Sequence, residues 1–214
     1  LSGRRPASAQ RARLEPEAHV STEPRPLATA RHFMIATANR HASEAGREIL
    51  AAGGSATDAA IAAALVLGLV EPQSSGLGGG GFLLNWDEER QRLTALDGRE
   101  TAPAAAKPDR FLRNGTPIDF ETAVKSGLSI GTPGAVRLME TAHQRHGKLP
   151  WARLFDPAIR LSEGGFPVSK RLHFLLLWNG AATFAPEARR YFFDERGRPR
   201  PSGYLLRNPS YAER

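Results

Sequence analysis

The segment from Asp97 to Pro103 contains an arginine whose surroundings suit the binding of a carboxylate. Arg99 directly follows a stretch that is typical of a β-strand, and the approach to Pro103 favours an extended path. A guanidinium presents a rigid planar fork that can hold a carboxylate through two parallel hydrogen bonds. Taken by themselves, the same residues also fit a more ordinary pattern: a surface arginine, or an ion pair with Asp97 or Glu100. The neighbours alone therefore favour no special role for Arg99.

A second candidate is the glycine tract at residues 76–81, which satisfies the pattern G-x-G-x-x-G. In dinucleotide-binding folds a strand precedes these glycines and a helix follows, because the helix N-terminus holds the pyrophosphate. Here a predicted helix precedes the tract and a predicted strand follows it, so the order disfavours a nucleotide site. The alternative is a turn whose backbone packs closely against a neighbouring segment.

The other reactive side chains form no recognisable catalytic set. The sequence has no cysteine, which excludes thiol catalysis, disulfides and cysteine-ligated metals, and it has no G-x-S-x-G elbow. His143 and His146 share a predicted helix face and could both ligate a metal, but no third ligand is placed near them. A solvated polar helix end is the favoured interpretation, and we predict no metal and no cofactor. Glu88 and Glu89 fall in a predicted turn and are interpreted as surface residues.

Charge and hydropathy exclude two further classes of function. The formal net charge is +7, but the arginines are scattered, and no run reaches the block of about five like charges that would indicate a binding arm. Aromatic residues do not alternate with basic ones as on a stacking surface, so we expect no nucleic-acid binding. The longest apolar stretch, Ala59–Val70, is shorter than the ~20 residues of a membrane-spanning helix, so no span is predicted.

Hydrophobic spacing and turn residues predict an α+β fold, a mixed sheet with helices packed on it. Residues 1–31 have almost no large apolar side chains and are predicted to be a disordered leader. Because residue 1 is leucine, we expect the chain to follow a processing point or to be cut from a longer sequence. The predicted elements at the start of the chain are a strand at 33–36, a helix at 42–52 ended by Gly53, and a buried helix from Ser55 with a capping box. They are followed by a hairpin of 82–86 and 92–97, helices at 133–147, from 151 to an end at Gly164–Gly165, and at 170–178, and a loop-rich tail from 191.

Several strings in order along the chain resemble the gamma-glutamyltransferase family. They are Ala42–Gly46, Ile49–Leu50 with Gly53–Gly54, Asp58–Ala60, Val70–Gly76 running into the glycine tract and Phe82, Asp97–Pro103, Gly131–Gly134, Gly147–Trp151, Pro157–Leu161 and Gly165–Ser169. Each string alone is weakly specific, but the ordered set is strong. The resemblance covers about residues 33–208.

This resemblance implies an N-terminal-nucleophile hydrolase, an αββα sandwich that is incomplete in this chain. Residues 32–214 would be the front part of the large subunit, with the domain continuing beyond them. In this family a precursor, the zymogen, cuts itself, and the new N-terminal threonine of the small subunit attacks the donor. Its own α-amine can serve as base. The gamma-glutamyl group of glutathione or a related donor then passes to an amino acid, a peptide or water.

By the same resemblance, Arg99 matches the arginine that binds the α-carboxylate of the donor. The family's nucleophile lies in a threonine-rich string followed by histidine, and no threonine here is followed by threonine or histidine. We therefore expect no catalytic residue in this chain and expect it to be inactive alone. The expected partners are a gamma-glutamyl substrate such as glutathione and the small subunit of the same precursor.

Other functions share the scaffold and stay open. They are an acylase of beta-lactam side chains, a depolymerase of poly-gamma-glutamate, and a non-catalytic fragment that only binds. The string around Arg99 favours a glutamyl donor that carries an α-carboxylate. Kinship to the family also implies a periplasmic or secreted location, although no signal is visible in the sequence.

Overall fold

The computed structural model describes residues 27–213. The chain divides into two units, Leu1–His32 and Phe33–Arg214. Of the first unit only residues 27–32 are described, and they form neither helix nor strand. The remainder of the predicted leader lies outside the described residues and stays a prediction. All further description concerns the second unit.

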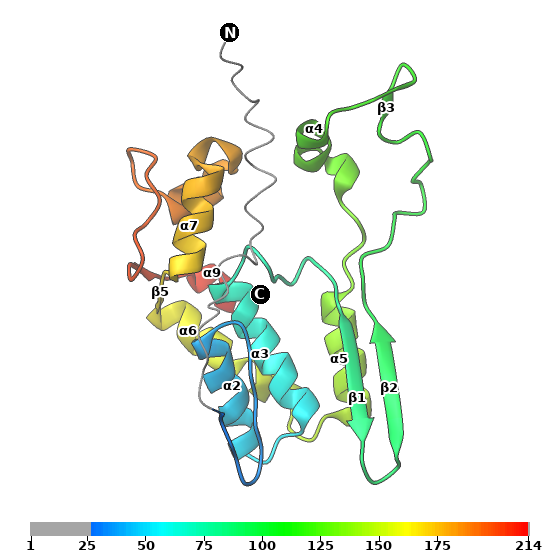
Figure 1. Ribbon diagram of the computed structural model, residues 1–214, viewed down its shortest axis with the longest axis vertical. Helices are drawn as coiled ribbons and strands as arrows, with labels where there is room; N and C mark the ends of the chain where they lie inside the picture. The colour runs from blue at the N-terminus through cyan, green and yellow to red at the C-terminus, as the bar shows by residue number, and fades with distance from the viewer. Residues whose placement is uncertain (1–26, 214) are drawn as a thin grey trace. The chain divides into compact units, whose positions relative to one another are not determined.

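The second unit is α+β, with helices around one apolar core and strands in antiparallel pairs (Figure 1). Its strand pairs are β1 (Phe82–Asp87) with β2 (Arg92–Asp97), β3 (Leu112–Arg113) with β4 (Thr116–Pro117), and β5 (Phe166–Pro167) with β6 (Leu205–Leu206). The α-helices are α2 (Arg40–Ala51), α3 (Ala56–Val70), α4 (Phe120–Lys125), α5 (Ala135–His146), α6 (Asp156–Gly164), α7 (Lys170–Asn179), α8 (Pro186–Phe192) and α9 (Pro209–Ala212). Three 3-10 turns are η2 (Gly127–Ser129), η3 (Trp151–Leu154) and η4 (Ala181–Thr183). Within residues 27–213 no sheet exceeds two strands, so the predicted larger mixed sheet is not formed there.

Helices α2 and α3 pack along each other and form the centre of the core. The side-chain oxygen of Asn39 accepts the His41 amide at 3.0 Å and begins α2. Gly53, at φ +87°, adopts the left-handed conformation that ends this helix, as its sequence predicts. Helix α3 is buried on nearly every side, which confirms the inference from its unbroken apolar run.

One buried carboxylate joins the start of α3 to the loop after α5. Ser55 and Asp58 form the predicted capping box, with the Asp58 amide donating to Ser55 Oγ at 3.1 Å. Asp58 is fully buried, and its Oδ2 accepts the amides of Lys148 and Leu149 at 2.9 and 3.1 Å. The same atom accepts the Ser55 amide at 2.9 Å. A cap that looks local in the sequence is therefore also a tertiary contact.

Two predicted elements differ from the structure. Residues 33–36 form no strand and have no strand partner among the described residues, and Ile35 instead packs against the core next to Gly46. The helix predicted from residue 151 ends at Gly164–Gly165 as expected, but it is divided into η3 and α6, because Pro157 cannot donate a helical hydrogen bond and is tolerated only in the first turn. Leu154 and Ala158 are nevertheless both buried, as their spacing predicts.

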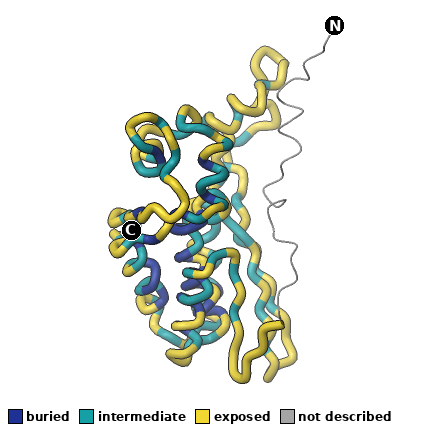
Figure 2. The backbone as a smooth tube through the Cα atoms, turned by 60° about the vertical axis from the view of Figure 1, so that its left-hand side comes forward, coloured by how far each residue is buried: buried dark blue, intermediate teal, exposed yellow. Residues whose placement is uncertain are grey.

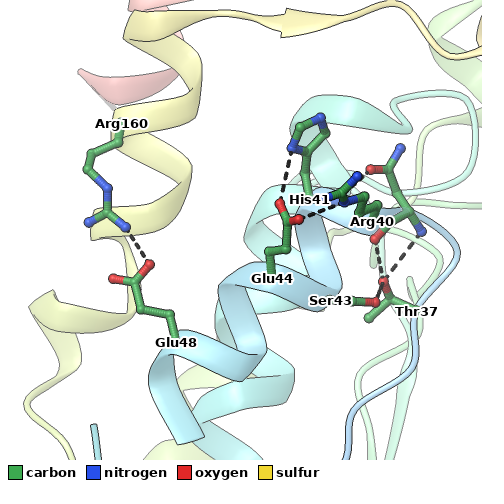
Figure 3. Close-up of polar contacts among 8 residues, drawn as sticks. Thr37, Arg40, His41, Ser43, Glu44, Glu48 and Arg160 are labelled. Carbon is green, nitrogen blue, oxygen red and sulfur yellow. Dashed lines mark hydrogen bonds and ion pairs between the residues drawn. The ribbon is translucent and has the colours of Figure 1, made fainter. Parts of the chain in front are cut away.

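Polar contacts on α2 tie this helix to its surroundings (Figure 3). Arg160 of α6 reaches across to Glu48 with Nη2 and Oε2 2.6 Å apart. Thr37 lies just before α2 and Ser43 lies in its first turn, and their Oγ1 and Oγ atoms are 2.8 Å apart. The Arg160–Glu48 pair is half-exposed, so it adds little to stability compared with the buried apolar face behind it.

Burial is uneven along the chain (Figure 2). The helical core holds the buried residues, whereas β1, β2 and the segment between β2 and α5 are mostly exposed or half-buried. On β1 the outward side chains Phe82, Leu84 and Trp86 are apolar and exposed, and the inward Leu83 is apolar as well. None of the described helices is long and apolar enough to cross a membrane.

Replacing Asp58 with alanine should lower the free energy of unfolding by about 3 kcal/mol, because a helix cap and two loop amides lose their acceptor together. Thermal or urea unfolding measures the loss. Asp119→Ala is the matched control, since Asp119 caps the exposed helix α4 from its own first turn, with the Thr122 amide as donor, and its loss should cost about 1 kcal/mol or less. Equal losses for the two variants would contradict the tertiary role of Asp58.

Two tyrosines provide a test of burial at high pH. Burial raises the pKa of Tyr191 and of Tyr211 to about 12, above the ~10 of an unfolded tyrosine. Between about pH 10 and 12 the folded state therefore keeps protons that the unfolded state has lost, so stability is full below pH 10 and falls as pH rises through that window. Either tyrosine-to-phenylalanine variant should weaken this alkaline loss in unfolding experiments.

At neutral pH the same two variants should differ. Tyr211 Oη donates to the Leu65 carbonyl at 2.8 Å, whereas the Tyr191 hydroxyl has no partner among the described residues. Tyr211→Phe should therefore cost about 1 kcal/mol and Tyr191→Phe nothing measurable. A larger neutral-pH loss in Tyr191→Phe would contradict this assignment.

Candidate functional site

Arg99 lies one residue beyond the glycine that follows β2. Its amide donates to Asp97 Oδ1 at 2.9 Å, a local turn that sets the backbone direction. Its Nη1 lies 3.3 Å from Glu100 Oε2, and the side chain is 58% exposed. The ion pair with Glu100 that the sequence suggested is therefore present. It is a single contact, and within residues 27–213 the guanidinium shows no other hydrogen bond or ion pair.

Arg99 lines a cleft of ≈ 750 Å³ beside the glycine tract. Apolar side chains from α3, β1 and α5 form one part of its lining, namely Ile61, Leu83, Leu138 and Met139. The polar part consists of Gln73, Ser74, Ser75, Arg99 and Glu100. A mainly apolar cleft with a few converging polar groups is the usual form of a small-molecule site.

The glycine tract packs directly against the backbone that carries Arg99. A Cβ at Gly80 would overlap the Gly98 carbonyl oxygen and lie 2.8 Å from the Arg99 Cα. Gly81 and Gly98 pair through both backbone hydrogen bonds, at 2.9 and 3.2 Å, and so extend the β1–β2 hairpin into the tract. This confirms the interpretation of the tract as a closely packed turn.

The start of α5 holds the same backbone from another direction. The Gly79 carbonyl accepts the amides of Gly134 and Ala135 at 3.1 and 3.0 Å. A Cβ at Gly134 would also overlap the Gly98 carbonyl oxygen. Arg99 is thus bracketed by the glycine tract, by the hairpin that follows the tract directly, and by α5, which is distant from both in sequence.

A buried acid, Glu71, positions the polar wall of the cleft. It is 3% exposed at the C-terminal end of α3, where its carboxylate accepts Asn39 Nδ2 at 2.8 Å and also accepts Gln73 Nε2. Its backbone carbonyl accepts the amides of Ser74 and Ser75 at 3.0 and 3.1 Å.

Helix α7 supports this wall through Arg171. Arg171 Nη1 lies 3.5 Å from Glu71 Oε2 and donates to Ser74 Oγ at 3.1 Å. Sequence reasoning did not identify Glu71 as part of the site. The sequence did contain one signal, the position of Glu71 at the C-terminal end of an apolar helix. An acid there opposes the helix dipole and needs compensating partners.

The two histidines do not form a metal site with other described residues, since no group of three potential ligands occurs within residues 27–213. The prediction of a solvated face is wrong for His143, whose side chain is 19% exposed. Its Nε2 donates to the Leu149 carbonyl at 2.8 Å, and its ring lies 5.1 Å from that of Trp151. His143 is therefore a packed histidine that closes the loop after α5. Glu88 and Glu89 lie in an exposed turn, as predicted.

Solved structures define the class of protein. The chain is similar to a gamma-glutamyltranspeptidase of Helicobacter pylori, with a TM-score of 0.81 and 30% identity over 88% of this chain and 54% of that one. It is also similar to a cephalosporin acylase of Bacillus halodurans, with a TM-score of 0.66 and 27% identity over 91% of this chain and 38% of that one. The α+β arrangement is therefore that of the N-terminal-nucleophile hydrolases.

The family follows from the sequence match. The family model described as Gamma-glutamyltranspeptidase matches residues 42–214, and the chain belongs to that family. The glutathione hydrolase proenzyme of Bacillus subtilis is 43% identical over 140 residues, which cover 65% of this chain and 24% of that protein. The chain spans 22–31% of the length of curated relatives such as this one.

Gly80→Ala should destabilise the fold by about 3 kcal/mol, because the new methyl group meets backbone atoms that cannot move without displacing Arg99. Gly81→Ala is the control, since a Cβ there meets nothing within 4 Å, and it should change stability by ~0.5 kcal/mol at most. Thermal unfolding of both variants makes the comparison. A tolerated alanine at residue 80 would show that the close contact is not a constraint.

Proposed function

We propose that this chain supplies the donor-binding part of a gamma-glutamyltransferase, or glutathione hydrolase, and that Arg99 binds the α-carboxylate of the donor. One observation carries the proposal. The Arg99 backbone is held by the glycine tract, while its guanidinium lines the cleft with a single contact to Glu100. Most of its donors are thus free to bind a carboxylate in the bidentate manner.

Such a contact anchors the end of the donor that does not react. With the α-carboxylate held, the gamma-amide is presented at a fixed distance and orientation, which lowers the entropic part of the barrier. The proposed nucleophile is the threonine at the N-terminus of the small subunit, which lies outside this chain. It attacks the amide carbonyl carbon, the C–N bond breaks, and the departing amine takes a proton. An amino acid, a peptide or water then accepts the gamma-glutamyl group.

The exposed face of β1 supports an αββα sandwich completed by further polypeptide. Phe82, Leu84 and Trp86 give this strand one apolar face that is exposed among the described residues, whereas Leu83, Asn85 and Asp87 lie on the opposite face. An exposed apolar face of this kind usually marks a surface that other polypeptide covers. We propose that the large-subunit domain continues beyond these residues, that the precursor cleaves itself, and that the mature enzyme is periplasmic or secreted.

Two other members of the same broad class are alternatives. The likeness to a cephalosporin acylase favours an acylase as the second candidate, with a poly-gamma-glutamate depolymerase or a non-catalytic fragment behind it. The guanidinium of Arg99, whose single contact is with Glu100, favours a donor with an α-carboxylate. A threonine nucleophile in the complete gene product would separate the enzymes from the non-catalytic fragment.

In the complete protein, Arg99→Gln should lower kcat/KM for a gamma-glutamyl anilide about 30- to 1000-fold, which corresponds to ~2–4 kcal/mol. Arg99→Lys should retain part of the activity, since it keeps the charge and loses the second hydrogen bond. Arg92→Gln, an exposed arginine at the far end of the hairpin, should change nothing.

A donor without the α-carboxylate sharpens this test. The 4-aminobutyryl anilide retains the scissile amide and lacks only the carboxylate, so the wild-type enzyme and Arg99→Gln should process it equally slowly. If Arg99→Gln keeps the wild-type preference for the gamma-glutamyl anilide over the 4-aminobutyryl anilide, Arg99 does not bind the donor's α-carboxylate.

A further inference from the structure

A second cavity, of ≈ 730 Å³, adjoins the cleft, because Arg99 and Glu100 line both. Its other walls come from the segment between β2 and α5. Lys107 and Arg110 contribute positive charge, and Phe111, Leu128 and Ile130 contribute apolar surface. Nothing in the proposed donor contact uses these residues.

The charges around this cavity are unbalanced. Its lining holds three cations, Arg99, Lys107 and Arg110, against the single carboxylate of Glu100. Arg110 Nη2 makes one long hydrogen bond, 3.4 Å to the Gly127 carbonyl, and its buried Nε has no partner among residues 27–213. A buried donor without an acceptor is costly, so an anion that reaches Arg110 would be bound with little competition from the protein.

The walls are held in place before any ligand arrives. Thr101 and Thr132 pair through backbone hydrogen bonds of 3.3 and 2.8 Å, which join the two ends of the segment. Within it, the Arg110 amide donates to the Lys107 carbonyl at 3.1 Å and the Ile118 amide to the Phe111 carbonyl at 2.9 Å. The two cations are therefore carried on a hydrogen-bonded turn, a preorganised arrangement that reduces the entropy lost on binding.

Building on the proposed function, we propose that this cavity binds the C-terminal carboxylate of a peptide, with Arg110 as the main contact and Lys107 as a supporting charge. A planar guanidinium suits a carboxylate, and the apolar walls suit the aliphatic part of a short peptide. The peptide has two sources, the leaving group of the donor and the acceptor. Both can use one site, because the second half of the reaction, in which an acceptor amine loses a proton and forms the new C–N bond, is the first half in reverse.

The test compares Arg110→Gln with the wild type in the complete protein. For glutathione, whose leaving peptide ends in a carboxylate, kcat/KM should fall about 10- to 100-fold. For glutathione amidated at its glycine carboxylate, and for the gamma-glutamyl anilide, it should stay within about twofold. Arg113→Gln, an exposed arginine of the same segment that does not line the cavity, is the matched control and should leave all three substrates unchanged.

A second arm tests the acceptor. With the anilide as donor, transfer to glycylglycine should weaken in Arg110→Gln, whereas transfer to glycylglycinamide should not. An effect on glutathione alone assigns the site to the leaving peptide, and an effect on glycylglycine alone assigns it to the acceptor. Equal losses with the carboxylate and amide forms, or no loss with either, overturn the proposal. The donor assignment is tested separately, by comparing Arg99→Gln with the wild type on the anilide. The anilide has no second carboxylate, so its kinetics do not depend on the proposed contact with Arg110.

Discussion

The candidate site depends on one steric constraint, the contact between the backbone of Gly80 and the backbone of residues 98–100. Any side chain at residue 80 would occupy the place of the Gly98 carbonyl oxygen, and Gly134 approaches the same oxygen. A Cβ at Gly98 would lie 2.6 Å from Leu138 Cβ of α5. The glycine tract and the residue before α5 therefore meet the hairpin end backbone to backbone, and the Leu138 side chain of α5 packs directly on Gly98. The position of Arg99 follows from these contacts.

The opposite wall of the cleft is held by a different kind of interaction. Glu71 is buried, and a buried carboxylate is stable only when hydrogen-bond donors surround it. Asn39, Gln73 and Arg171 supply those donors from the segment before α2, the turn after α3 and the start of α7. The polar wall is thus tied to the helical core, whereas Arg99 is tied to the hairpin and α5. The cleft lies where these two parts of the unit meet.

Local signals in the sequence predicted the local features of this arrangement. The capping box at Ser55, the glycine stop after α2 and the β1–β2 hairpin are each encoded within a few residues. The strand expected at 33–36 is wrong because a strand needs a partner that short-range pattern cannot show. The partners of Glu71, the packed state of His143 and the second cavity likewise depend on residues distant in sequence. The role of Arg99 came from the family resemblance, since its neighbours favoured an ordinary ion pair.

Two arginines near the cleft differ in how far other residues of the chain engage their side chains. Arg171 is directed at a buried carboxylate and a serine hydroxyl, so its hydrogen-bonding capacity is used by the protein itself. Arg99 contacts only Glu100 among the described residues, through a single pair of atoms 3.3 Å apart, and its own side chain is 58% exposed. The other guanidinium nitrogens of Arg99 are therefore open to a ligand carboxylate. Under the proposed function, further polypeptide and substrate would exclude water from the cleft, and the charge interaction with the ligand would strengthen because it would act in a lower effective dielectric.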